Sequence, residues 1–436
     1  MTASAIESTF THESLQAFIA SRGEPEWLGQ LRRSAWQTFC GLAWPSRRDE
    51  EWMRTDIRVF KLDKYAPPQG AAETIPPPRT LLSEGVELAG ASSSVNSRPA
   101  GCHLKPQWAR QGVLFGSLDT LLLEHAELLR PFLSRAVRPD YDKFSALHAA
   151  FWSGGQLLYV PRGVVVDEPF HALAALTNGG VDFGHTLVIL DEGAEATVLS
   201  ETASQLPQDE GFHCGATELL LAPGANLRYV QLQDWGQGVW HFAHQQALVQ
   251  RDASLQWTVA ALGCRLSKVN QHVCLVGEGA RCQVNGVMFT EGKQHLAYHT
   301  LQHHAAAHCQ SDFLYKAALQ DRSHTVWRGM IQVDPAAQKT NGYQRNDNLL
   351  LSTQARADSI PGLEIQADDV RCTHGSTTGK VDEELIFYAM CRGFSRREAT
   401  RMIVTGFFQQ VFDRITIESV RDALGRAIAA RVREYE

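Results

Sequence analysis

Cys372 and His374 are separated by one residue, which places two side chains capable of metal chemistry close together in the sequence. On a β-strand, residues i and i+2 project from the same face, so this thiol and this imidazole would lie side by side. Both groups suit iron and iron-sulfur chemistry, and the thiolate could alternatively accept sulfur. For a C-x-H sequence taken alone, a buried cysteine beside a hydrogen-bonded histidine is the commoner arrangement.

A second group of candidate ligands consists of five histidines: His295, His299, His303, His304 and His308. On a helix, their spacing of four would align four imidazoles for a metal ion. The surrounding sequence favours strands, on which His295, His299 and His303 still share a face but lie far apart along it. We therefore favour a structural or interface role for this histidine group over metal binding.

Nine cysteines are scattered through the chain, and no two of them have C-x-x-C spacing. Zinc ribbons and self-contained ferredoxin-type sites require clustered thiolates, so neither is predicted. An odd, dispersed set in a long chain is also unlike a disulfide framework. We expect no tightly bound cofactor in this chain alone, and any iron-sulfur cluster that it touches should be shared with another chain.

Two motifs near the candidate pair invite comparison with enzymes. Gly375–Lys380 is glycine-rich like a P-loop, but three residues separate its glycines where four are needed, and Val381 replaces the Mg²⁺-binding hydroxyl. We interpret it as a turn, so nucleotide hydrolysis would come from a partner. Asp368, Asp369 and Arg371 could instead serve a carbohydrate-active β-helix enzyme. The apparently reduced cysteines and apolar C-terminal helices, which a secreted enzyme does not need, argue against that alternative.

The composition excludes several classes of partner. With 41 basic and 48 acidic residues, the formal net charge is −7, so no basic field is present to hold a nucleic acid backbone. The first eighteen residues lack the basic and apolar regions of a signal peptide, and no apolar run approaches the ~20 residues that cross a bilayer. We expect a soluble, cytoplasmic protein of two or three domains that binds neither nucleic acid nor membrane.

An internal repeat occupies the middle of the chain. Short turns recur at intervals of 31, 28 and 27 residues, at Glu192–Ala194, Pro223–Ala225, Arg251–Ala253 and Glu278–Ala280. Weaker copies at Arg162–Gly163, Ala305–Ala306 and Pro335–Ala336 extend the period in both directions. The flanking runs are rich in β-forming residues, and units of this length bury their apolar faces against their neighbours. The repeat predicts a mainly β fold with a β-solenoid core over residues 155–380.

Helical regions are expected on both sides of this core. Residues 1–65 form an N-terminal helical region, residues 66–101 a proline- and serine-rich linker, and residues 102–154 a mixed connecting region. After residue 380 the helical pattern returns, with Asp382 able to cap one helix and Ser395–Glu398 forming a capping box for the next. The apolar coverage of residues 381–436 exceeds what a terminal cap needs, which indicates a docking surface.

A resemblance to a known family is carried mainly by Arg345–Ser352, Pro361–Gly375, Asp382–Glu384, Phe387–Tyr388 and Arg392–Gly393. These segments look like the signature region of the SufB/SufD family of iron-sulfur cluster assembly proteins. The likeness extends to Gln338–Thr340 and His308–Ser311, and weakly to Pro45–Trp52, so it covers most of the chain. Cys372–Gly375 resembles the SufD branch, because SufB sequences have a Glu-His-Glu-Ala type segment there. Ala355 stands where SufB has a cysteine important for cluster formation.

The resemblance implies a right-handed parallel β-helix flanked by helices, in a scaffold subunit without catalytic activity of its own. Its partners would be SufB, which pairs with the solenoid, and the ABC-type ATPase SufC, which docks on the C-terminal helices. His374 would be a candidate iron ligand at the SufB interface and help hold a transient cluster shared with SufB, with Cys372 the weaker candidate. The resemblance also implies support for iron acquisition and use of reduced flavin by the complex, for which we assign no residue. A homodimeric interaction protein without a cluster role is the remaining alternative.

Overall fold

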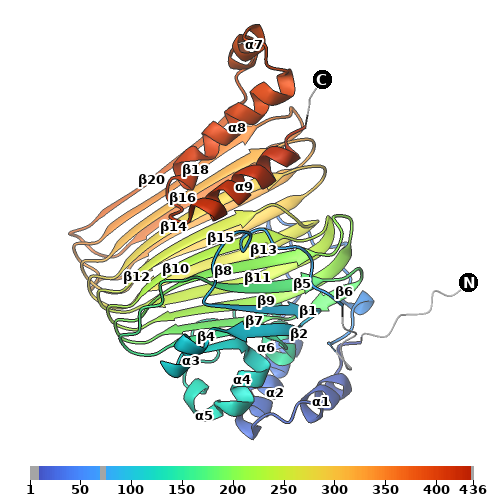
Figure 1. Cartoon of the computed structure of the whole chain (residues 1–436), viewed down its shortest axis with the longest axis vertical. Coiled ribbons are helices and arrows are strands. Elements are labelled where there is room, and N and C mark those ends of the chain that lie inside the picture. Colours follow the sequence, from blue (N-terminus) through green and yellow to red (C-terminus); the bar gives the residue numbers. More distant parts are fainter. Residues whose placement is uncertain (1–8, 69–74, 434–436) are drawn as a thin grey trace, which may run out of the picture.

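The computed structural model describes residues 9–68 and 75–433, and most of them form a solenoid of two facing ten-stranded sheets (Figure 1). Among the described strands, neighbouring strands are parallel except in the β1–β2 and β3–β4 pairs. The prediction of a mainly β protein with a parallel solenoid and helices at both ends is confirmed.

The two sheets are built from strands that alternate along the chain. In spatial order, sheet A contains β2 (Arg98–Leu104), β1 (Gly90–Val95), β5 (Phe170–Leu176), β8 (Glu195–Ser204), β10 (Asn226–Asp234), β12 (Ser254–Ala261), β14 (Arg281–Thr290), β16 (Gln310–Leu319), β18 (Asn341–Leu350) and β20 (Arg371–Lys380). Sheet B contains β19 (Arg356–Ile365), β17 (His324–Val333), β15 (His295–His304), β13 (Leu266–Leu275), β11 (Gly238–Val249), β9 (Glu210–Leu221), β7 (His185–Leu190), β4 (Gly155–Val160) and β3 (Leu114–Ser117), with β6 (Gly180–Asp182) paired to β9.

The repeated turns stack into a column at one corner of the solenoid. In each turn one residue has positive φ, and its amide donates to a carbonyl of the next turn; these residues are Gly163, Gly193, Gly224, Asp252, Gly279, His308 and Lys339. Glycine or aspartate at this position made the first copies visible in the sequence, because such residues tolerate the left-handed conformation. The last two copies have His308 and Lys339 at this position, so their sequences match the repeat less well.

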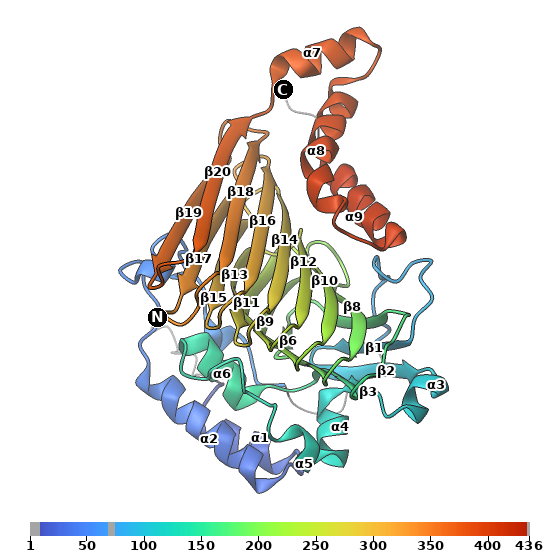
Figure 2. The ribbon, with the colours of Figure 1, turned by 90° about the vertical axis from the view of Figure 1, so that its left-hand side faces the viewer.

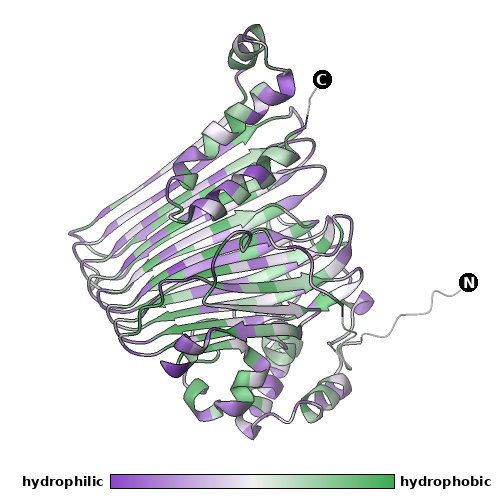
Figure 3. Ribbon diagram, viewed as in Figure 1, coloured by the Kyte–Doolittle hydropathy of each residue, from purple (hydrophilic) through white to green (hydrophobic). Residues whose placement is uncertain are grey.

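The interior between the sheets is packed by side chains that stack in register from one turn to the next. One column in sheet A runs through Tyr229, Trp257, Val284 and Phe313, all of which are buried. Hydrophilic and hydrophobic residues alternate along many strands (Figure 3), as expected where only one face of a sheet enters the core. The solenoid thus holds its shape by repeating the same contact at every turn.

Helices and short segments cover the first end of the solenoid. They comprise α1 (His12–Ala20), α2 (Glu26–Gly41), the 3₁₀ helices η1 (Glu50–Trp52) and η2 (Leu62–Lys64), α3 (Pro106–Arg110), α4 (Leu118–Glu124), α5 (Ala126–Leu129) and α6 (Lys143–Phe151). An aromatic cluster joins α6 to sheet B, with the rings of Phe144 and Phe242 stacked 3.8 Å apart. The buried Glu218 carboxylate accepts amide hydrogen bonds from Ser134, Ala136 and Val137 and so fixes the loop before α6. No helix in the described ranges is both long and apolar enough to span a bilayer.

The C-terminal helices leave the other end of the solenoid and turn back over sheet A. Helix α7 (Glu383–Cys391) is capped by Asp382 and α8 (Arg396–Phe412) by the Ser395 capping box, as the sequence predicted. Helices α8 and α9 (Glu418–Arg431) bury one apolar face against sheet A, whereas α7 projects beyond the last strands (Figure 2).

The sheets begin earlier than the sequence indicated. Residues 90–104, expected to lie in the linker and the start of the connecting region, form β1 and β2, and β1 pairs in parallel with β5. The sequence of β1 is Gly-Ala-Ser-Ser-Ser-Val, and Ser92 and Ser94 are buried. Small hydroxyl side chains fit a close approach of strands but give no apolar alternation, so the sequence pattern of this strand resembles that of a linker.

Candidate functional site

The last turn of the solenoid is open. Strand β20 pairs only with β18, and β19 pairs only with β17, so each presents a free edge within the part of the chain that the structure describes. Figure 2 shows this end beyond β18, away from the N-terminal helices. Free strand edges carry unpaired amide and carbonyl groups and are natural places for another chain to add.

Cys372 and His374 both lie on the interior face of β20. Their register partners in β18 are Gly342 and Gln344, both of which are buried, and the Gln344 amide reaches across the interior to the Gly362 carbonyl at 2.9 Å. The expected side-by-side arrangement on a strand is therefore what the structure contains. Because no further turn of the described residues stacks above them, these interior positions face outward at the open end.

Cys372 is half-buried at the base of this end. It packs against a small apolar cluster that includes Ile331, Val333 and Ala337. Burial raises the pKa of the Cys372 thiol, and a backbone hydrogen bond with Gly342 opposes the shift. The thiol form is favoured at neutral pH, so Cys372 would ligate metal only if an incoming cation displaced its proton.

His374 is exposed and has no hydrogen-bond or ion-pair partner among the described residues. It continues the column of Phe313 and Gln344, so the interior changes from aromatic to polar over the last turns. An imidazole that is free on both nitrogens can ligate a metal without first losing an interaction. This makes His374 the stronger of the two sequence-predicted ligands.

The facing strand adds an apolar rim that sequence reasoning did not single out. Leu363 and Ile365 of β19 are 38% and 40% exposed, and their register partners Ile331 and Val333 in β17 are fully buried. The only signal in the sequence was the solenoid period, which assigns Leu363 and Ile365 to interior positions. These interior apolar side chains are exposed to solvent at the open end, and a second chain could bury them.

Asp368 and Asp369, considered for a carbohydrate enzyme, lie in the turn between β19 and β20. The Asp369 amide donates to the Gln338 side chain, and its carbonyl accepts from the Lys339 amide. These contacts continue the stacked corner of the solenoid. The Asp369 backbone therefore has a structural role in this corner.

The histidine group has separate partners rather than a common centre. Strand β15 carries His295, His299 and His303 on its outer face; His295 contacts His324, and His303 contacts Asp334, each at 3.0 Å. His304 points inward, where it bonds to Ser311 at 2.7 Å. Within residues 9–68 and 75–433, no cluster of three or more histidine, cysteine or acidic side chains is arranged to hold a metal ion.

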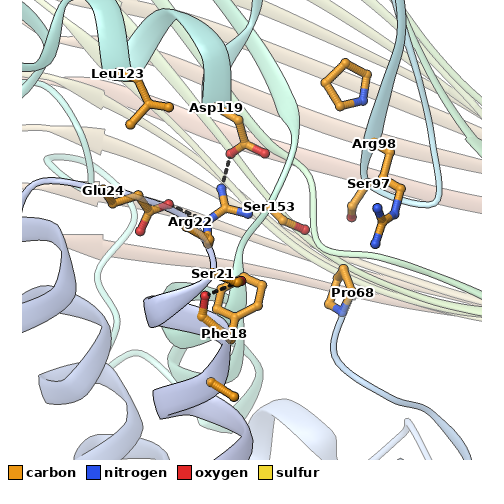
Figure 4. A pocket seen from close by; sticks show the side chains of 12 residues that line it. Phe18, Ser21, Arg22, Glu24, Pro68, Ser97, Arg98, Asp119, Leu123 and Ser153 are labelled. Atoms are coloured by element: carbon orange, nitrogen blue, oxygen red, sulfur yellow. Dashed lines mark hydrogen bonds and ion pairs between the residues drawn. The ribbon is translucent and has the colours of Figure 1, made fainter. Parts of the chain in front are cut away.

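A pocket of about 490 Å³ lies at the opposite end of the molecule, between α1, the β1–β2 turn and α4 (Figure 4). The Arg22 guanidinium there is neutralised by Glu24 and Asp119. Arg98 points into the same pocket. Because neither Cys372 nor His374 lines it, the candidate site is an open surface rather than this cavity.

Comparison with known proteins identifies the family to which this chain belongs. The SufBD core domain of the SUF system for iron-sulfur cluster assembly matches residues 173–407, and the SufBD N-terminal region matches residues 11–171. The chain belongs to the SufBD family. The core match runs from β5 into α8 and so contains the whole open end, including the candidate pair.

Relatives within the SufBD family are similar along nearly their whole length. An iron-sulfur cluster assembly SufBD family protein of Staphylococcus saprophyticus is 27% identical over 90% of this chain and 83% of the relative. The iron-sulfur cluster assembly protein SufB of Bacillus subtilis is 26% identical over 94% of this chain and 91% of the relative. A SufBD family protein of Staphylococcus haemolyticus is likewise 26% identical, with the same coverage. The chain thus belongs to the iron-sulfur cluster assembly proteins of the SUF system.

Proposed function

We propose that this SufBD family chain is a SufD-type subunit, which completes an iron-sulfur cluster assembly complex by pairing with a SufB-type subunit. The observation that carries the proposal is the open last turn, with His374 free on its interior face. Ala355 supports the SufD-type assignment, because this buried alanine in the turn before β19 packs into the main core and offers no ligand. A subunit of this kind supplies part of a site and relies on its partner for the remainder.

Pairing with SufB would occur by edge-to-edge contact of the two solenoids. The free edges of β19 and β20 supply backbone groups, while Leu363 and Ile365 supply apolar surface. A partner strand laid on β20 would also cover His374. Cluster building would then take place between the chains, where protein groups from both sides can ligate a cluster that neither holds alone.

His374 is the residue that we assign to the nascent cluster, with Cys372 in a secondary role. A neutral imidazole can ligate iron directly, whereas the half-buried Cys372 thiol must first lose its proton. Support for iron acquisition fits the same residue, since iron would be bound before sulfide completes the cluster. The cluster is cargo of the assembled complex rather than a resident cofactor of this chain.

Docking of the ATPase SufC is assigned to α7 and the start of α8. This segment exposes Leu385, Phe387, Tyr388, Met390, Phe394 and Met402, although α8 and α9 bury their opposite faces on sheet A. Such a concentration of large apolar side chains on a projecting helix is typical of a binding surface. ATP hydrolysis and any use of reduced flavin belong to the complex, and this chain would act as a scaffold.

Co-expression with SufB and SufC, followed by anaerobic affinity isolation, tests the assignment. The expected result is a complex of all three proteins whose iron and sulfide fall sharply in the His374→Ala variant while subunit yields stay equal. Isolation of this chain as a stable homodimer that captures neither partner would instead favour the interaction-protein alternative. Activity on a polyuronate would favour the carbohydrate enzyme.

A further inference from the structure

Three side chains on the outer face of sheet B form a cysteine–histidine–aspartate group away from the open end. Cys274 of β13 and His303 of β15 are direct register partners, and Asp334 follows β17 one turn further along. The solenoid period brings them together, because they are 29 and 31 residues apart in the sequence. No motif search with short spacing would have found this group.

The contacts of the group converge on the Cys274 sulfur. His303 Nε2 lies 3.0 Å from Asp334 Oδ1, and His303 stands beside Cys274 as its register partner on the neighbouring strand. From another direction the Gln246 amide donates to the Cys274 sulfur at 3.4 Å. An imidazole beside a cysteine sulfur that accepts from an amide resembles the surroundings of nucleophilic cysteines, and a carboxylate behind the imidazole orients the ring. Consistently, Cys274 and Asp334 raise the pKa of His303 to about 9.

The other thiols lack this environment. Burial raises the pKa of six of them, namely Cys102, Cys214, Cys264, Cys282, Cys309 and Cys372. Cys40 and Cys391 are exposed, and neither has an imidazole partner in the described ranges. Cys274 is 8% exposed and lies on the outer face of sheet B, not in the solenoid interior.

We propose that Cys274 is a nucleophilic thiolate that reacts with small hydroperoxides, with His303 as the proton donor. The sulfur attacks one oxygen of hydrogen peroxide, the O–O bond breaks, and an S–O bond forms, which gives a sulfenic acid. The departing hydroxide takes the imidazolium proton and leaves as water, so sulfur is oxidised by two electrons and the peroxide is reduced by two. Asp334 acts as a positioning residue, because it contacts the imidazole and not the reacting atoms.

The inference does not depend on the proposed role of His374 and can be tested on the full-length chain alone. Reduced protein is treated with hydrogen peroxide, sulfenic acid is trapped with dimedone, and modification of each cysteine is followed by peptide mass spectrometry. We expect Cys274 to be labelled before the far more exposed Cys391. Faster or equal labelling of Cys391 would overturn the proposal, because exposure alone would then decide reactivity.

Variants of the two partners separate chemistry from structure. His303→Gln should slow labelling of Cys274 about a hundredfold, the scale of a lost proton donor, while labelling of Cys391 stays unchanged. Asp334→Asn should slow it less and shift the pH profile of Cys274 alkylation by iodoacetamide toward higher pH. Circular dichroism melting checks that each variant is folded. An unchanged rate in a folded His303→Gln protein would also refute the assignment.

Discussion

Replacing Phe387 with alanine should weaken SufC binding without affecting the fold. Phe387 lies on the projecting helix α7 and is 68% exposed. Full burial of a phenylalanine side chain is worth about 1.5–3 kcal/mol, so covering the exposed part contributes about 1–2 kcal/mol. Since 1.4 kcal/mol corresponds to a factor of ten, the Kd for SufC should rise about 5- to 30-fold.

Two control variants distinguish docking from folding. Phe408→Ala removes a side chain that is 0% exposed between α8 and sheet A, so it should cost about 3–5 kcal/mol of stability and lower Tm. Val59→Ala alters an apolar side chain of similar exposure in the N-terminal region. It should change neither Tm nor SufC affinity.

Isothermal titration of purified SufC into each variant measures the affinity, and differential scanning calorimetry measures Tm. The reasoning is refuted if Phe387→Ala binds SufC as tightly as the unaltered protein. It also fails if Val59→Ala weakens binding equally, since the loss would then reflect general apolar exposure rather than a site on α7.

The remaining predictions concern the open end, the turns and the buried histidines. His374→Ala should change the free energy of unfolding by less than about 0.5 kcal/mol, yet it should deplete iron and sulfide in the co-expressed complex. Cys372→Ser should deplete them less. Equal iron and sulfide contents in the two variants would contradict this prediction. Gly224→Ala should lower the free energy of unfolding in urea by about 1–2 kcal/mol. The loss would come from the backbone conformation, because φ of Gly224 is 71° and an added Cβ atom would meet no atom closer than 4.0 Å. An unchanged urea midpoint would contradict this prediction. Burial lowers the pKa of His272 and His295 to about 3, whereas the value in the unfolded chain is near 6.5. The contribution of these neutral histidines to the free energy of unfolding is therefore complete above pH 6.5 and is lost as the pH falls toward 3. Chemical denaturation at pH 7.5 and 5.5 should show a decrease of up to about 1.4 kcal/mol per histidine, and a flat profile would argue against neutral burial.

The sequence was sufficient for the solenoid because each turn repeats a local conformational requirement. Gly193, Gly224 and Gly279 mark positions where the backbone must be left-handed, and the period follows from their spacing. It was insufficient for β1, whose buried serines resemble a linker. Strand pairing there depends on β5, some eighty residues away, and no local pattern records such a contact.

The candidate site was predicted only in part, for a related reason. Cys372 and His374 share a strand face simply because of their spacing, so their proximity could be predicted. The exposure of Leu363 and Ile365 could not be predicted, because the interior positions of a last turn show the same apolar pattern as those of a middle turn. What distinguishes them is the absence of a further described strand beside β19 and β20.

The uncapped turn also bears on how copies of this chain avoid pairing with one another. A solenoid with one bare end offers a template onto which a second copy could add through the same end. Pro361 supplies no backbone donor in the middle of β19, which interrupts any continuous ladder of hydrogen bonds laid along that edge. Exposed charged side chains at Arg356, Glu364 and Lys380 must be desolvated or paired by any added strand, which favours a partner of complementary charge. The same edge can therefore remain receptive to a dedicated partner while discouraging pairing between two copies of this chain.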